Sequence, residues 1–332
     1  MANTYISQGG RMGSGQQERM TMKIRGGRKT WTLSKVFAVC LIAIGIRPFA
    51  LGDMSVASSA ETVNAKAAAL VPETIRSSGV LRVGTNLPYA PMEYFAGDGR
   101  SPTGVDVDLA AAIAARLGLR VDFVNMNWDG LIPALNSGRF DMIAASVGDF
   151  VARERQADFV DYMKTGVSFV VSKASETEYK TDSGLCGKSL SAARGTDSSR
   201  LIADVVKKCA NEGKRGTSAS VFPDDNAGLL AVRSKRVDAH AMDSISAAYE
   251  ASTEQGRTVY SRVLADFGAT KALYGMVVAK KNRPLTDALA LVLADMIADG
   301  SYKAILKKYG VADAAISAIT INAGGKEAAA NE

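Results

Sequence analysis

Histidine and cysteine are scarce in this chain of 332 residues, and their scarcity argues against whole classes of site. The sequence holds one histidine, His240, and three cysteines, with no Cys-x-x-Cys motif. Transition-metal sites are built mainly from these two residue types at characteristic spacings. We therefore predict no metal site, and we expect no cofactor. His240 alternates with alanines on an expected strand, which favours a structural role for it.

Net charge of one sign is also lacking over most of the chain. The full sequence carries a formal net charge of +6, from 40 Lys and Arg against 34 Asp and Glu. Residues 1–60 contain eight of the basic and two of the acidic residues, which leaves 32 of each sign in residues 61–332. A nucleic-acid-binding surface needs an excess of positive charge. We therefore predict no nucleic-acid partner.

The longest apolar run lies near the N-terminus and is short for a membrane span. Residues 36–46, VFAVCLIAIGI, follow a basic stretch at 25–35. A spanning helix needs about 20 residues, whereas a signal peptide has a basic start, a shorter apolar core and a small-residue cleavage site. We predict that residues 1–60 are a signal peptide and leader and that the mature protein is periplasmic. A retained membrane anchor is the alternative.

Export makes the two remaining cysteines informative. Cys186 and Cys209 flank one expected strand–helix unit, and an oxidising compartment favours disulfide formation. We predict a disulfide between them, worth about 3 kcal/mol on the chain-entropy model. Two buried thiols are the alternative.

Alternating helix-like and strand-like patterns predict an α/β fold. In residues 128–162, a short amphipathic helix opened by Asp129 runs into the apolar strand FDMIAAS at 140–146. A helix followed by a buried strand favours a parallel sheet, and ligands bind beyond the carboxyl ends of such strands. Here that end is Ser146 to Gly148, followed by Arg153.

A second copy of this unit is present. ALNSGRFDMIAAS (134–146) aligns without a gap with AVRSKRVDAHAMD (231–243), which places Ser146 opposite Asp243. Two such units would present cationic Arg153 and anionic Asp243 to a shared space. A ligand with a carboxylate and an ammonium group suits that pair. A chance likeness between two ordinary strand sequences is the alternative.

The order of the units predicts two lobes, each a mixed sheet flanked by helices, with two chain crossings that form a hinge. We expect a linker at 61–71, for which a frayed helix is the alternative, and a C-terminal tail at 317–332. The first lobe would comprise residues 72–165 and 274–316, and the second lobe residues 166–273.

Several segments, in this order along the chain, resemble the polar amino acid-binding proteins of ABC importers, solute-binding protein family 3. They are LRVGTNLPYAPMEY (81–94), GVDVDLAAAIAARLG (104–118), WDGLIPALNSGRFDMI (128–143), the Arg153 segment ending in DFVDY, and YGMVVAKK (274–281). The likeness runs from about residue 72 to 312. It implies a non-enzymatic protein of periplasmic-binding-protein type II-like fold, which closes on an L-amino acid and delivers it to permease subunits in the membrane.

The resemblance also implies roles for individual positions. Arg153 matches the arginine that binds the α-carboxylate, and Asp243 matches the carboxylate that receives the α-ammonium, assisted at the Ser146 position. Side chains at the positions of Tyr89 and Trp128 flank the ligand's side chain. The loop Gly195, Thr196 and Asp197 matches the one whose amides add to carboxylate binding. Considered without the family, Arg153 also fits a solvated charge, Asp243 a helix N-cap and Trp128 a core residue.

Three positions depart from the family pattern. Gly148 and Phe150 stand where the family usually has hydroxyl side chains, so ammonium binding would depend more on Asp243 and Ser146, while backbone amides at 148–150 can still serve the carboxylate. Asn86 stands where binders of arginine or lysine often carry Asp. A polar and neutral ligand such as glutamine is therefore expected.

Two other functions fit the same fold. One is a periplasmic dehydratase or lyase acting on an amino acid precursor, for which Glu93 and Asp243 are the candidate acid or base residues. The other is a sensory module with a receptor or kinase as its partner.

Overall fold

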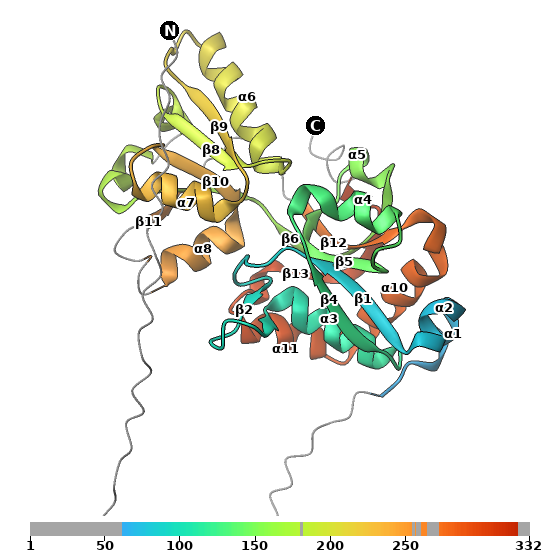
Figure 1. Ribbon diagram of the computed structural model, residues 1–332. Helices are drawn as coiled ribbons and strands as arrows, with labels where there is room; N and C mark the ends of the chain where they lie inside the picture. The colour runs from blue at the N-terminus through green and yellow to red at the C-terminus, as the bar shows by residue number, and fades with distance from the viewer. Residues whose placement is uncertain (1–61, 180–181, 254–255, 257–259, 264–271, 325–332) are drawn as a thin grey trace, which may run out of the picture. The chain divides into compact units, whose positions relative to one another are not determined.

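The computed structural model of the protein describes residues 62–179, 182–253, 256, 260–263 and 272–324 (Figure 1). The predicted signal peptide and leader lie outside the described residues. No helix within the described ranges combines the length and apolar character needed to cross a membrane.

The first sheet is mixed, as predicted, and its six strands run in the order β13-β6-β12-β5-β1-β4. β1, β4 and β5 are parallel, whereas β12, β6 and β13 join by antiparallel pairing. The bounds are β1 (Val80–Thr85), β4 (Arg120–Asn125), β5 (Met142–Gly148), β6 (Ala157–Thr165), β12 (Ala272–Ala279) and β13 (Ala315–Ile321). A separate two-stranded sheet pairs β2 (Tyr94–Phe95) with β3 (Pro102–Thr103).

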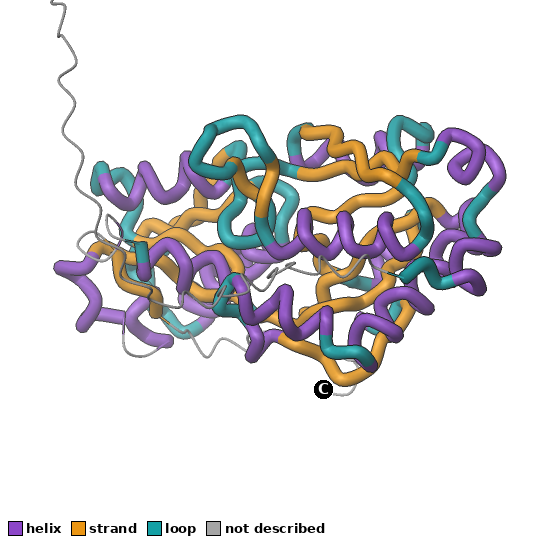
Figure 2. Tube along the Cα trace, turned by 90° about the horizontal axis from the view of Figure 1, so that it is seen from below, coloured by secondary structure: helices purple, strands orange, loops and turns teal. Residues whose placement is uncertain are grey.

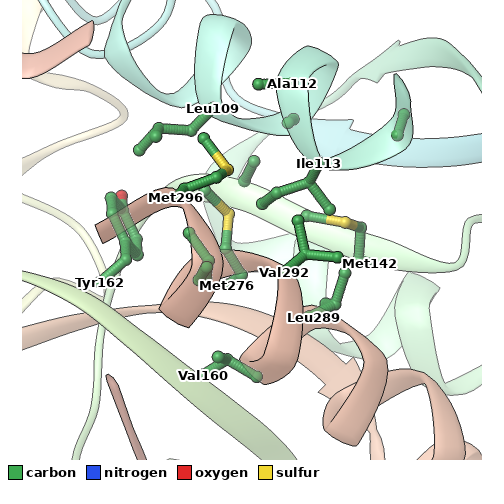
Figure 3. Packing of buried hydrophobic residues seen from close by; sticks show 14 of the residues in the cluster. Leu109, Ala112, Ile113, Met142, Val160, Tyr162, Met276, Leu289, Val292 and Met296 are labelled. Atoms are coloured by element: carbon green, nitrogen blue, oxygen red, sulfur yellow. The ribbon is translucent and has the colours of Figure 1, made fainter. Parts of the chain in front are cut away.

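Helices flank this sheet (Figures 1 and 2). Their bounds are α1 (Ala65–Leu70), α2 (Glu73–Ser78), α3 (Val105–Arg116), η1 (Trp128–Gly130), α4 (Leu131–Asn136), α5 (Val151–Glu154), η4 (Lys280–Asn282), α10 (Arg283–Ala298), α11 (Ser301–Lys308) and η5 (Ala312–Ala314). Leu109 and Ile113 of α3 are spaced four apart, so they project from one face of the helix. They pack with Val292 and Met296 of α10 (Figure 3). This packing holds the sheet that carries the carboxyl end of β5.

The second sheet has five strands in the order β11-β7-β10-β8-β9. β8, β9 and β10 are parallel, and β7 pairs antiparallel with both β10 and β11. The bounds are β7 (Val167–Ser172), β8 (Ser189–Ala193), β9 (Ser218–Phe222), β10 (Ala239–Asp243), β11 (Tyr260–Val263), η2 (Lys173–Tyr179), η3 (Asp182–Leu185), α6 (Asp197–Asn211), α7 (Asp225–Arg233) and α8 (Ser244–Ser252). The predicted disulfide between Cys186 and Cys209 is present.

The chain passes between the sheets twice, as predicted. It leaves the first sheet through Gly166, which alone separates β6 from β7, and it rejoins that sheet at β12.

The repeated sequence forms a repeated structure. In one copy α4 leads into β5, which lies between the parallel β1 and the antiparallel β12. In the other α7 leads into β10, which lies between the parallel β8 and the antiparallel β7. The helix–strand turns also agree, because Gly138 and its counterpart Lys235 both have positive φ, 79° and 57°.

An aspartate, buried in the first copy and exposed in the second, fixes each strand in the same way. The Asp141 carboxylate accepts a 2.9 Å hydrogen bond from the amide of Arg82 at the start of β1. Its counterpart Asp238 accepts a 2.7 Å hydrogen bond from the amide of Ser189 at the start of β8. The duplication therefore extends from the sequence to individual hydrogen bonds.

Some local expectations were wrong. Residues 65–70 of the predicted linker form α1, which is capped by Asn64 and buries Ala67. Asp129 makes no capping hydrogen bond to the helix that follows it; it lies within η1.

The predicted C-terminal tail begins as a strand. β13 extends to Ile321 and pairs with β6. Beyond it, the amide of Gly324 donates a 2.8 Å hydrogen bond to the Asp149 carboxylate. The Asp161 carboxylate accepts hydrogen bonds from Thr320 Oγ1 at 2.7 Å and from the amide of Ala323 at 3.3 Å. Two buried carboxyl groups thus hold the end of the described chain against the first sheet.

Candidate functional site

A hollow of about 820 Å³, open solvent included, is lined by residues from both sheets. Nine residues singled out from the sequence line it: Asn86, Tyr89, Glu93, Trp128, Ser146, Gly148, Thr196, Asp197 and Asp243. Arg153, Phe150 and Gly195 are not among its lining residues. We refer to this hollow as the cavity.

Asp243 ends β10 and caps α8. Its Oδ1 accepts hydrogen bonds of 3.0 Å from the amides of Ile245 and Ser246, and its Oδ2 accepts one from the hydroxyl of Tyr89. Burial raises the pKa of Asp243 to about 6, although the two amides favour the ionised form. The N-cap alternative is therefore correct, and the same carboxylate also faces the cavity.

Arg153 lines a neighbouring hollow, together with Trp128 and Gly195. Its guanidinium donates to the carbonyl oxygens of Gly148 at 2.9 Å and Gly195 at 3.1 Å, and it pairs with the Asp197 carboxylate at 3.4 Å. The guanidinium carbon lies 5.6 Å from the centre of the Trp128 ring, within cation–π distance. Arg153 is only 9 % exposed, and burial lowers its pKa. An arginine stays charged even so. Thus Arg153 touches cavity residues without lining the cavity.

The loop after β8 links the two sheets. Gly195, with a φ of 75°, presents its carbonyl oxygen to Arg153 and, at 3.4 Å, to Trp128 Nε1. Thr196 caps the 15-residue helix α6 by accepting a hydrogen bond from the Ser199 amide. Amides at such a helix start attract anions.

The lack of a side chain at Gly148 makes room for the ring of Phe150. A Cβ at Gly148 would lie 2.3 Å from the Phe150 ring and 2.8 Å from Asp197 Oδ2. The Phe150 ring itself lies under the Arg153 guanidinium, with 5.4 Å between the guanidinium carbon and the ring centre. The two departures from the family pattern are thus coupled, because the Phe150 ring occupies the space that a side chain at position 148 would need.

A buried carboxyl pair lies beside Ser146, which adopts a φ of 50°. Asp106 accepts hydrogen bonds from the Ser146 amide at 2.6 Å and from the Tyr162 hydroxyl at 2.5 Å. Burial raises the pKa of Asp106 to about 6. Burial and, secondarily, Asp106 raise the pKa of Glu93 well above its usual range. Glu93 lines the cavity, is 1 % exposed, and its Oε2 has no hydrogen-bond partner.

The sequence analysis missed Pro223, Asp224 and Asp225, which lead into α7 and also line the cavity. A signal was available, because extending the gapless repeat backwards places Asp225 opposite Trp128. The side chain of Asn86, by contrast, donates its amide to the Met126 carbonyl oxygen at 2.9 Å. No group of three or more His, Cys, Asp or Glu residues within the described ranges is placed to hold a metal ion.

These features define a class of protein. Residues 81–323 match the bacterial extracellular solute-binding proteins, family 3, and the chain belongs to that family. The family resemblance and the two-lobed mixed fold predicted from the sequence are therefore confirmed.

Particular relatives share most of the chain. The L-cystine-binding protein TcyA of Bacillus subtilis is 29 % identical over 236 residues, which cover 71 % of this chain and 83 % of TcyA. The arginine-binding protein ArgT of Corynebacterium glutamicum is 28 % identical, over 76 % of this chain and 82 % of its own. A solved ancestral arginine-binding protein with bound arginine is 31 % identical, with a TM-score of 0.62 over 70 % of this chain and 98 % of its own. These relatives are named as binding proteins, which supports the non-enzymatic interpretation over the dehydratase or lyase alternative.

Proposed function

We propose that this protein is an exported receptor that captures an L-amino acid in the cavity and delivers it to the permease of an ABC importer. The observation on which the proposal depends is the buried Asp243 carboxylate in the cavity wall, with the capped start of α6 lining the same cavity. Family membership and relatives that bind cystine and arginine support the amino acid as ligand.

Asp243 is proposed to receive the α-ammonium group. A buried carboxylate facing an ammonium gains a charge-assisted hydrogen bond, worth about 1.5–3 kcal/mol. Tyr89 already donates its hydroxyl to this carboxylate. Ser146 is less available than the family pattern implies, because its hydroxyl lies 3.2 Å from Asp106 Oδ2. We therefore assign most of the ammonium binding to Asp243.

The α-carboxylate is proposed to bind at the start of α6, beside Arg153. The guanidinium is paired with Asp197, so a ligand carboxylate would replace that carboxylate as its partner. Such an exchange conserves charge at Arg153 and leaves Asp197 with its second partner, Arg200. Tyr89 and Trp128 would flank the ligand's side chain, since both line the cavity.

Calorimetry with the twenty amino acids tests the proposal. Arg153→Ala should remove detectable binding, a loss of about 3–5 kcal/mol for an orphaned buried charge. Asp243→Asn, which keeps a capping oxygen but removes the charge, should weaken binding at least about tenfold. Arg155→Ala is the matched control, because Arg155 is an exposed arginine two residues further along. Unchanged affinity in both site variants would refute this site.

Export and delivery are separate parts of the proposal. N-terminal sequencing of the mature protein should find a start between about residues 51 and 68. Uptake of the bound amino acid by vesicles that hold the partner permease should require the protein. A mature protein that retains Cys40 would contradict the export step.

A further inference from the structure

One carboxylate of the cavity is held in place by a buried histidine. Asp225, the first residue of α7, lines the cavity, and its Oδ1 lies 2.8 Å from Nε2 of His240. The His240 side chain is completely buried, and its Nδ1 lies 2.9 Å from Ser191 Oγ. A carboxylate only accepts hydrogen bonds, so Nε2 carries the proton. The imidazole thus orients the Asp225 carboxylate, and on its other side it contacts the Ser191 hydroxyl, which also donates to the Ala239 carbonyl oxygen at 3.3 Å.

The first copy of the repeat shows that the fold does not need the contacts from Ser191 through His240 to Asp225. Ile143 of β5 stands opposite His240, and its strand neighbour there is Gly84, where β10 has Ser191. Buried polar groups are costly unless they are hydrogen-bonded, whereas isoleucine fills the same place without that requirement. Packing alone therefore does not account for a histidine at position 240.

Helix α7 is also shaped around the imidazole. A Cβ on Gly228 would lie 2.0 Å from the His240 ring, so only glycine lets the helix approach this closely. The close approach keeps the ring under the first turn of α7, where Asp225 begins the helix. Gly228 and His240 thus support Asp225, and of the three only Asp225 lines the cavity.

The charges of the cavity wall are of one sign. Among the residues that the structure describes, its lining includes five acidic residues, Glu93, Asp197, Asp224, Asp225 and Asp243, and no lysine, arginine or histidine. Asp197 is paired with Arg153 and Arg200. Asp224 caps α7 through a 2.8 Å hydrogen bond from the Ala227 amide. Within the described ranges, no lysine or arginine forms an ion pair with Asp225.

We propose that Asp225 selects the side chain of the ligand, that it selects a guanidinium or ammonium group, and that His240 is its positioning residue. The inference rests on the proposed function, and it deepens that function by naming the substrate class as cationic L-amino acids. Asp225 is the counterpart of Trp128, the residue expected to flank the ligand's side chain. We propose this cationic ligand in place of the neutral one expected from Asn86, because Asp225 supplies the negative charge that Asn86 lacks.

Ligand pairs that match in length but differ in charge test this inference. On the mature protein, calorimetry should give tighter binding of L-arginine than of L-citrulline, and of L-lysine than of L-norleucine. Asp225→Asn should lower the affinity for the cationic members by about 10–100-fold and change that of the neutral members by less than about threefold. Asp204→Asn is the charge-matched control, because Asp204 is exposed on α6 of the same lobe. It should change neither the affinity for the cationic ligands nor that for the neutral ones.

A positioning role for His240 has its own signature. His240→Ile installs the residue found in the first copy, and it should weaken arginine binding about 3–10-fold without affecting citrulline. In the Asp225→Asn background the same change should cause no further loss, because it acts through that carboxylate. Equal weakening of arginine and citrulline would show that His240 is only structural.

The outcomes separate the two proposals. Equal losses within each ligand pair for Asp225→Asn, or a wild-type preference for the neutral members, would overturn the role of Asp225. The proposed function would survive that result if Asp243→Asn still weakened binding of the preferred amino acid at least about tenfold. Absence of binding by every L-amino acid would overturn both.

Discussion

The two copies of the helix–strand unit, α4–β5 and α7–β10, share a backbone and differ in what they present to the cavity. Both strands lie between one parallel and one antiparallel neighbour, and both are anchored by an aspartate. At their carboxyl ends, however, Ser146 stands opposite Asp243. The shared residues are those the fold requires, and the differing ones are candidates for function.

A second difference between the two halves is covalent. The second sheet carries the disulfide between Cys186 and Cys209, whereas the described part of the first sheet contains no cysteine. Replacing both cysteines with serine should lower the free energy of unfolding by about 3 kcal/mol, because the unfolded chain gains conformational freedom. Urea denaturation would measure it. Reduced wild type should match the variant, and hydrogen-exchange protection should fall mainly in the second sheet; an unchanged midpoint would contradict this.

The first sheet has its own special feature in the Asp149 and Asp161 pair, for which the repeat places Ser246 opposite Asp149. Burial raises the pKa of Asp149 to about 8 and that of Asp161 to about 6. The folded protein therefore holds a proton on Asp149 that the unfolded chain releases near pH 4. The free energy of unfolding consequently falls as pH rises from about 4 to 8. Above that range the full penalty of holding an ionised Asp149 in the folded state is present.

Asp149→Asn should remove this penalty. Asparagine keeps an oxygen for the Gly324 amide and offers an N–H to Asp161. The variant should be more stable than wild type by on the order of 1–3 kcal/mol at pH 8, with little difference at pH 4. Thermal unfolding across that pH range would measure it. A constant difference at all pH values would mean that Asp149 does not titrate as proposed.

The smallest effect concerns the helix–strand turns. Gly138 and Lys235 occupy the same position with positive φ, a region that costs a side-chain-bearing residue about 1 kcal/mol. Gly138→Ala should therefore destabilise the protein by about 1 kcal/mol, and Lys235→Gly should stabilise it slightly. Shifts of opposite sign in the two denaturation midpoints would support the equivalence of the two turns, and shifts of the same sign would contradict it.

Much of the architecture could be predicted from the sequence, because it depends on local patterns. The repeat, the disulfide and the helix of Leu109 and Ile113 follow from spacing and composition. β13 could not be predicted, because its pairing depends on the distant edge of β6. Nor could the placement of Arg153, since its partners Gly195 and Asp197 lie more than 40 residues away in sequence. His240 was expected to be structural because it alternates with alanines on a strand, and its contact with Asp225 could not be predicted because the two residues lie 15 positions apart.

The attachment of the chain's end has a practical consequence for building a sensor from this protein. The Gly324 amide donates a hydrogen bond to the carboxylate of Asp149, which lies four residues before Arg153. A fluorescent reporter fused shortly after residue 324 would therefore sit close to the loop that carries the guanidinium. We expect its emission to respond to amino acid capture more strongly than a dye on the far end of α6.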